Sequence, residues 1–318
     1  AQIDWYSQFD ILVTHDPLPE EQVRQLRAAG TSLVLYEWAV AFYDSLATEW
    51  QRSLLASKAG LLNSSPLTGG LGSATSGAWY FDPAAPSHRD RAAVLAKRIA
   101  AAGYQGVFLD TTTEASVHPT AAAEFSRRHP ATAYDAAYSA FLGDLRRELG
   151  AGIIFTNQGY RSAQYYLPHV DWDLTESLMT RPQGSVFVLR PWNDRKDPWN
   201  SISFLMRNLI GPIAARHPNV RFGHLNYVGG AAPETINVVH AIASIFDSDA
   251  FVSAPELEDE VSTVYFRDPG TPLSRRMDAA DESASWRFFE HALIAVSASR
   301  AAGPPSLRSS GASIRASR

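Results

Sequence analysis

Two carboxylic acids in this sequence stand at the ends of short apolar runs. Asp110 ends GVFLD (106–110), and Glu176 lies near the end of DWDLTES (171–177). An apolar run that stops at a carboxylate is typical of a buried strand that reaches the protein surface or the mouth of a cleft. Two carboxyl groups can hydrolyse a glycosidic bond, because one protonates the leaving oxygen and the other attacks the anomeric carbon or activates water. We therefore predict Asp110 and Glu176 as a catalytic pair.

Each carboxylate also has a plain structural interpretation. An aspartate at a strand end often caps the next helix or turn, and the glutamate in LTESL could be solvated or salt-bridged. Asn157 ends a further apolar run, GIIFTN (152–157), which lies between the two acids in the chain. Two carboxylates at neighbouring strand ends, with Asn157 between them, favour catalysis.

Other side chains near strand ends are candidates for binding a substrate. Besides Asn157, they are Tyr36, Glu37, Asp82 and Tyr227. His15 follows the first apolar run, where it could contact a substrate, although a lone histidine is more often structural. These residue types could hold sugar hydroxyls and orient the two carboxylates.

The sequence RPWNDRKDPWN contains two tryptophans with two possible roles. Trp192 and Trp199 either form a wall that stacks on sugar rings or pin a loop through buried indoles, and the sequence supports both roles equally. Further upstream, HVDWD places His169, Asp171 and Asp173 at alternating positions, where a strand could turn them to one side and bind a metal. Their place near the start of the run favours a structural role. We predict no metal site and no cofactor.

The elements that would position these side chains alternate between strands and helices. One predicted helix carries Tyr134, Tyr138, Phe141, Leu142, Leu145 and Leu149 on one face, and another closes the chain over 283–300. Eight apolar runs predict strands at 10–14, 32–38, 78–83, 106–110, 152–157, 171–177, 220–227 and 249–253.

This alternation predicts the α/β class and a (β/α)8 TIM barrel as a single domain over residues 1–302. An open doubly wound sheet is the competing topology, but no G-x-G-x-x-G follows the first strand. Residues 303–318 are rich in Pro, Ser and Arg and predict a disordered tail. In a TIM barrel the C-terminal ends of the strands and the loops after them form the active site. The polar strand-end residues should therefore share one cleft.

Composition excludes several classes of function. The net charge of −5 and the pI near 6.0 argue against a nucleic-acid surface, which needs a basic stripe. No apolar run is long enough to cross a membrane, and the absence of cysteine rules out disulfides. We expect a monomer that acts on a polysaccharide outside the cell or in the periplasm, with a signal peptide already removed from the start at Ala1.

Four motifs in the order AWYFDP, GYQGVFLDTTTE, IIFTNQGY and WDLTESL resemble the strand motifs of glycoside hydrolase family 114. That family comprises endo-α-1,4-polygalactosaminidases, and the hydrolase domain that acts on the Pel biofilm polysaccharide is related to it. The resemblance implies a retaining barrel hydrolase of α-1,4-linked galactosamine or N-acetylgalactosamine polymers. It also implies that Asp110 and Glu176 are the family's acids on strands four and six. Trp79 to Asp82, Asn157 with Gly159, and Tyr227 match further family positions.

The sequence departs from the family pattern at two strands. Glu37 and Trp38 follow Tyr36 directly where members carry a Gly-Glu pair, and Asn226 precedes Tyr227 where members carry an aspartate. These changes leave open a barrel that binds carbohydrate without cleaving it. A phosphate-binding barrel is a third alternative, for which the last loops offer only the glycines at 229–230.

Overall fold

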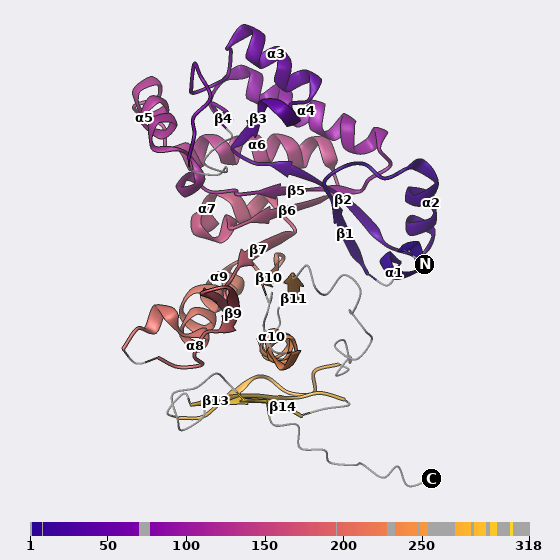
Figure 1. Cartoon of the computed structure of the whole chain (residues 1–318), viewed down its shortest axis with the longest axis vertical. Coiled ribbons are helices and arrows are strands. Elements are labelled where there is room, and N and C mark those ends of the chain that lie inside the picture. Colours follow the sequence, from indigo (N-terminus) through magenta and orange to yellow (C-terminus); the bar gives the residue numbers. More distant parts are fainter. Residues whose placement is uncertain are drawn as a thin grey trace. The chain divides into compact units, whose positions relative to one another are not determined.

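The structure is a computed structural model. It describes residues 2–7, 9–69, 77–194, 196–227, 233–246, 249–253, 271–280, 283–290, 293–297 and 306–307. The chain forms two compact units, residues 1–174 and 175–318, and each is described separately below (Figure 1). The predicted single domain over 1–302 stays a prediction.

The first unit is built on a parallel sheet. Its strands are β1 (Ile11–Thr14), β2 (Ser32–Trp38), β5 (Gly106–Asp110), β6 (Ile153–Asn157) and the first residues of β7 (Trp172–Glu176), and neighbours in this order pair in parallel. They read as nearly continuous apolar runs because strands of a parallel sheet are covered on both faces. Leu33, Val34 and Leu35 of β2 are fully buried.

Successive parallel strands are joined by helices, as the sequence predicts. The helix with the predicted apolar face is α6, and it buries Tyr134, Tyr138, Phe141, Leu142 and Leu145. It packs against α4 (Figure 1). The helices of this unit are α1 (Gln2–Tyr6), α2 (Glu20–Ala28), α3 (Glu49–Ser57), α4 (Pro86–Ala101), α5 (Pro119–Arg128), α6 (Tyr134–Leu149) and α7 (Ala163–Tyr166). Single turns of 3-10 helix are η1 (Asp44–Leu46), η2 (Glu114–Ser116), η3 (Gly159–Ser162) and η4 (Leu167–His169).

One glycine allows two strands of this sheet to approach closely. A Cβ atom at Gly106 would lie 2.3 Å from the backbone oxygen of Ile153, which is shorter than any real contact. Only glycine therefore fits at the start of β5, where the strand pairs with Ile153 of β6.

The third predicted strand has a different partner from the one predicted. AWYFDP forms β4 (Ala78–Tyr80), which pairs antiparallel with β3 (Ala41–Tyr43) and does not join the parallel sheet. The two strands belong to a small apolar cluster that includes Phe42, Trp79 and Phe81. A short apolar run looks the same whichever way its partner runs, so the sequence pattern could not reveal this pairing.

The second unit continues the strand–helix–strand pattern. β10 (Arg221–Tyr227) and β11 (Asp249–Ser253) are parallel, and α10 (Pro233–Ile245) connects them, as predicted. The helical segment before β10 consists of α8 (Ile202–Leu205), a π-helical segment η6 (Met206–Ile210) and α9 (Gly211–Arg216), and it follows the turn η5 (Pro198–Asn200). A hairpin of β8 (Thr180–Gln183) and β9 (Val186–Leu189) comes before them.

The predicted closing helix over 283–300 is wrong. This segment contains β13 (Ala284–Phe288) and β14 (Leu293–Ser297), which pair antiparallel with each other and with β12 (Met277–Asp278) and β15 (Ser306–Leu307). Burial alternates along β13, where Ser285 and Arg287 are buried and Trp286 and Phe288 are more exposed. Burial with a period of two is typical of a strand, and the segment forms strands although it contains the helix-favouring residues Ala and Leu. Apart from β15, the predicted disordered tail at 303–318 lies outside the described residues.

Candidate active site

Asp110 is held at the end of β5 by its two neighbouring strands. Asn157 at the end of β6 donates from Nδ2 to Asp110 Oδ1 at 2.6 Å. Tyr36, near the end of β2, donates its hydroxyl hydrogen to Asp110 Oδ2. Each carboxylate oxygen thus accepts one hydrogen bond, and the two bonds fix the direction of the carboxylate. The structure brings together these three predicted residues.

Aromatic rings line one side of this aspartate, and we call them the aromatic wall. His15 stacks on Tyr36 with ring centroids 3.9 Å apart. Trp38 forms T-shaped contacts with Tyr36 and Tyr43, with ring centroids 5.7 Å and 5.6 Å apart. Burial and the negative charge of Asp110 raise the pKa of the Tyr43 phenol above its usual value. Flat aromatic surface beside a fixed carboxylate suits a ring-shaped ligand with polar edges.

Sequence reasoning did not find Tyr43. This residue lies in β3, a strand that the sequence analysis did not predict, and it reaches the site because β3 follows β2 after a short turn. The signal that could have found it is the aromatic pair FY in AFYD, whose tyrosine lies five residues after Trp38. Aromatic pairs of this kind are common in ordinary cores, so the signal is weak.

The backbone turns sharply after each of three predicted site residues. Thr111, Gln158 and Ser177 have φ angles of 58°, 65° and 52°, and each directly follows Asp110, Asn157 or Glu176. Left-handed backbone is unfavourable for residues other than glycine. Among the described residues, Lys58 is the one other non-glycine with positive φ. Strained backbone of this kind tends to gather at functional sites.

Glu176 ends β7 and belongs to the second unit. The hydroxyl of Tyr227, at the end of β10, donates to Glu176 Oε2 over 3.4 Å, which is a long hydrogen bond. The ring of Tyr227 packs against Phe187 with centroids 5.6 Å apart. The structure therefore pairs the second predicted carboxylic acid with a predicted tyrosine.

Glu37 lies among helical residues behind β2. Its side chain points away from that of Tyr36, because neighbouring residues of a strand face opposite sides. Arg98 Nη1 lies 2.7 Å from Glu37 Oε2, and Gln51 Nε2 donates to Oε1 at 3.2 Å. Arg91 Nη2 is 3.6 Å from the same Oε1. This buried network occupies the carboxylate of Glu37, and its predicted contact with a substrate stays a prediction.

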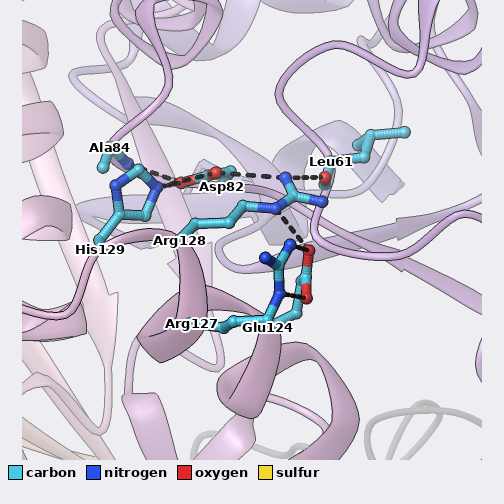
Figure 2. A network of polar contacts seen from close by, with 7 residues as sticks. All are labelled: Leu61, Asp82, Ala84, Glu124, Arg127, Arg128 and His129. Carbon is cyan, nitrogen blue, oxygen red and sulfur yellow. Dashed lines mark hydrogen bonds and ion pairs between the residues drawn. The ribbon is translucent and has the colours of Figure 1, made fainter.

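Asp82 follows β4 and joins two loops to the end of α5 (Figure 2). His129 Nε2 lies 3.1 Å from both carboxylate oxygens, and Arg128 Nη1 lies 3.5 Å from Oδ2. Arg128 also donates to the carbonyl oxygen of Leu61 at 2.7 Å, and the backbone N–H of Ala84 donates to Asp82 Oδ1 at 3.1 Å. The carboxylate is almost fully buried, and its partners tie the loop after β4 to the segment that follows Asp110.

The two tryptophans of the loop before α8 differ in exposure. Trp192 is buried at 1% exposure and packs against Phe246, whereas Trp199 is 63% exposed. For Trp192, this burial favours the interpretation as a pinned loop over a sugar-stacking wall.

The residues of HVDWD do not converge on a metal. His169 Nε2 lies 3.1 Å from Ser139 Oγ, Asp171 pairs with Arg146 at 2.5 Å, and Asp173 hydrogen-bonds to Thr156 at 2.7 Å. Within the described residues, no group of three or more acidic, histidine or cysteine side chains could hold a metal ion. The glycines at 229–230, noted for phosphate binding, lie outside the described residues.

Comparison with known proteins agrees with this architecture. No model of a protein family matches the sequence, and no curated protein matches it. The glycoside hydrolase domain of PelA from Pseudomonas aeruginosa superimposes with a TM-score of 0.57 at 20% identity, over 82% of this chain and 93% of that domain. A variant of the same domain gives 0.54 at 21% identity, over 80% and 90%. Amy13B of Eubacterium rectale gives 0.55 at 7% identity, over 93% of this chain and 80% of that one.

The chain has a TIM-barrel fold. The predicted fold class and the resemblance to the Pel hydrolase domain are thereby confirmed at the level of the fold. Among the described parts of the chain, none of the helices combines the length and the apolar character that crossing a membrane requires.

Proposed function

We propose that the protein is a glycoside hydrolase with Asp110 and Glu176 as its catalytic carboxyl groups. One observation carries the proposal: a tyrosine and an asparagine from neighbouring strands hold Asp110 at a strand end, beside the aromatic wall. The TIM-barrel fold, which the chain shares with the PelA glycoside hydrolase domain, supports it. Fold alone does not determine chemistry, so the local geometry at Asp110 is the stronger support.

The proposed mechanism retains the configuration at the anomeric carbon. Asp110 attacks this carbon while the bond to the leaving oxygen breaks, and Glu176 gives its proton to that oxygen. Glu176 then removes a proton from water, and the oxygen of that water displaces Asp110 from the sugar. The hydrogen bonds from Tyr36 and Asn157 support the first role, because a nucleophile must keep one direction of attack.

The proposed substrate is a polysaccharide of α-1,4-linked galactosamine or N-acetylgalactosamine. The four strand motifs that resemble glycoside hydrolase family 114 support this choice. We assign contacts with the sugar to Tyr36, Asn157, Tyr227 and the aromatic wall. The buried partners of Glu37, Asp82 and Trp192 favour a supporting role for these three residues. Because such a polymer is too large to enter a cell, we propose that the protein acts after export.

The direct test is incubation with partly deacetylated α-1,4-galactosaminogalactan, followed by mass spectrometry of released oligosaccharides. We expect release by the wild type and none by Asp110→Asn or Glu176→Gln. Asp144→Asn is a matched control, because this partly exposed carboxylate pairs with Arg147 on the surface of α6. No release by the wild type from any galactosamine polymer would contradict the proposed substrate. Release that survives Asp110→Asn would contradict the proposed nucleophile.

One observation favours a second function, a barrel that binds carbohydrate without cleaving it. Glu37 stands where the family motif is altered, and Arg98 and Gln51 occupy its carboxylate. A non-catalytic protein would bind the polymer without turnover, and its binding would change little between about pH 5 and 8, since no carboxyl group would need a tuned pKa. A bell-shaped pH–rate profile on any glycan would exclude this alternative.

A further inference from the structure

Asp173 is a fully buried acid directly behind the turn that follows Asn157. Its Oδ1 accepts hydrogen bonds from Thr156 Oγ1 at 2.7 Å and from the backbone N–H of Gly159 at 2.8 Å. Its Oδ2 accepts one from the backbone N–H of Tyr160 at 2.7 Å. All of these partners are neutral, and two of them belong to the turn itself. A buried carboxylate with several well-aligned donors makes a rigid local structure.

The backbone of this turn depends on that carboxylate. Gln158 adopts a φ of 65°, and its N–H donates to the carbonyl oxygen of Leu174 at 2.8 Å. A Cβ atom at Gly159 would lie 2.8 Å from Asp173 Oδ1, so only glycine lets the backbone approach this closely. The turn is therefore shaped by contacts with β7.

The same turn sets the position of Asn157. Its carbonyl oxygen accepts a hydrogen bond from the N–H of Thr112 at 2.9 Å, and its Nδ2 donates to Asp110. Asn157 is thus held from the β5 side by Thr112 and Asp110, and from the β7 side through the turn. A small displacement of the backbone after Asn157 would lengthen the 2.6 Å bond to Asp110.

We propose that Asp173 is a positioning residue for catalysis. From β7 it holds the turn that follows Asn157, and this turn keeps the Asn157 amide against Asp110. It touches neither Asp110 nor the sugar and acts through Asn157. The inference rests on the proposed function, since it assigns Asp110 the attack on the sugar. The positioning of Asn157 by Asp173 does not depend on whether the protein is an enzyme.

The charge of the carboxylate matters to this role. Burial raises the pKa of Asp173 to about 7, although the hydrogen bonds from Thr156, Tyr160, Gly159 and Leu174 lower it. Protonation would turn one acceptor oxygen into a hydroxyl donor that faces the N–H groups of the turn. Asp173→Asn imitates this state, because it replaces one oxygen with an NH2 group of similar size.

The first readout is spectroscopic and needs no activity. In 1H–15N spectra, the side-chain amide of Asn157 is assigned by its loss in Asn157→Ala. We expect Asp173→Asn to move this signal towards the position of a solvent-exposed amide. Asp171→Asn is the matched control, since Asp171 lies two residues away and accepts from the N–H of Ile154 at the other end of β6, at 2.8 Å. An unmoved Asn157 signal in folded Asp173→Asn would overturn the proposal.

The second readout is a double-mutant cycle in kcat. We expect Asp173→Asn to lower kcat roughly tenfold to a hundredfold with a much smaller change in KM, and to have little further effect in the Asn157→Ala background. Equal effects of Asp173→Asn in both backgrounds, or no effect on kcat, would overturn the proposal. If Asp173→Asn does not fold, Thr156→Val serves both readouts, because it removes one donor to Asp173 and keeps the side-chain shape. If the wild type cleaves no glycan, the proposed function fails and the spectrum alone decides the role of Asp173.

Discussion

The two predicted catalytic acids end strands in different units of the chain, and their surroundings differ. Asp110 accepts a hydrogen bond at each oxygen, from Tyr36 and from Asn157. The hydrogen bond that Glu176 accepts from Tyr227 is long, at 3.4 Å. The Asn157–Asp110 bond is 2.6 Å long, and this difference in bond length fits the two proposed roles. A nucleophile must keep one direction of attack, whereas a general acid must exchange protons first with the leaving oxygen and then with water.

The largest expected effect is the loss of the proposed nucleophile. Asp110→Asn should lower kcat by about 10⁴-fold or more and leave the affinity for glycan nearly unchanged. For the wild type, 1H NMR of the first product from an α-linked substrate should show the α-anomer. With Asp110→Ala, added azide should take the place of the carboxylate and give a β-glycosyl azide. A β-anomer formed first by the wild type would mean inversion, and Asp110 would then not be a nucleophile.

Loss of the proposed acid should have a large effect that depends on the leaving group. Glu176→Gln should lower kcat by roughly 10² to 10⁴-fold on polysaccharide. On a synthetic glycoside with a good leaving group, kcat should fall far less, because this leaving group departs without a proton. Steady-state rates on both substrates measure this. An equal loss on the two substrates would remove the distinction between the roles of Asp110 and Glu176.

The buried acid behind the Asp110 site should make stability depend on pH. The pKa of Asp173 is about 7 in the folded protein and 3.8 in its ordinary state. The folded state therefore holds more protons between these values, and stability falls as the pH rises from about 4 to about 7. Each pKa unit corresponds to about 1.4 kcal/mol, so the free energy of unfolding falls by at most about 4 kcal/mol. Urea unfolding at pH 4.5 and pH 8 should show this loss in the wild type and a smaller one in Asp173→Asn. The same pH dependence in both proteins would contradict the assignment to Asp173.

The smallest expected effect is that of Tyr227→Phe, which we compare with that of Tyr36→Phe. Tyr36→Phe removes a hydrogen bond to a catalytic carboxylate and should lower kcat about tenfold or more, since bonds to charged groups contribute about 1.5–3 kcal/mol. Tyr227→Phe removes a longer and weaker contact, and we expect a loss of about threefold or less. The measurement is kcat of both variants under identical conditions. A larger loss of kcat in Tyr227→Phe than in Tyr36→Phe would contradict the proposed difference between the Asp110 and Glu176 sites.

The predicted positions of the parallel strands agree with the structure for a physical reason. A strand covered on both faces needs a continuous apolar run, and the run ends where the chain reaches solvent. Asp110, Asn157 and Glu176 could therefore be placed at strand ends from the sequence. Pairing direction has no such signal, so β4 was assigned to the barrel sheet although it pairs with β3. A closing helix was predicted over 283–300, whereas burial along β13 follows the period of two of a strand.

The sequence by itself determined which residues end the parallel strands and, through the alternation of strands and helices, the barrel class. These features depend on local composition and on the order of elements along the chain. The tertiary structure decided which strand-end side chains meet. It joins Tyr36 and Asn157 to Asp110, turns Glu37 towards Arg98, and places Asp173 behind the turn after Asn157. Such contacts depend on strand register and on the face to which each residue points, which are settled only when distant segments pair and pack.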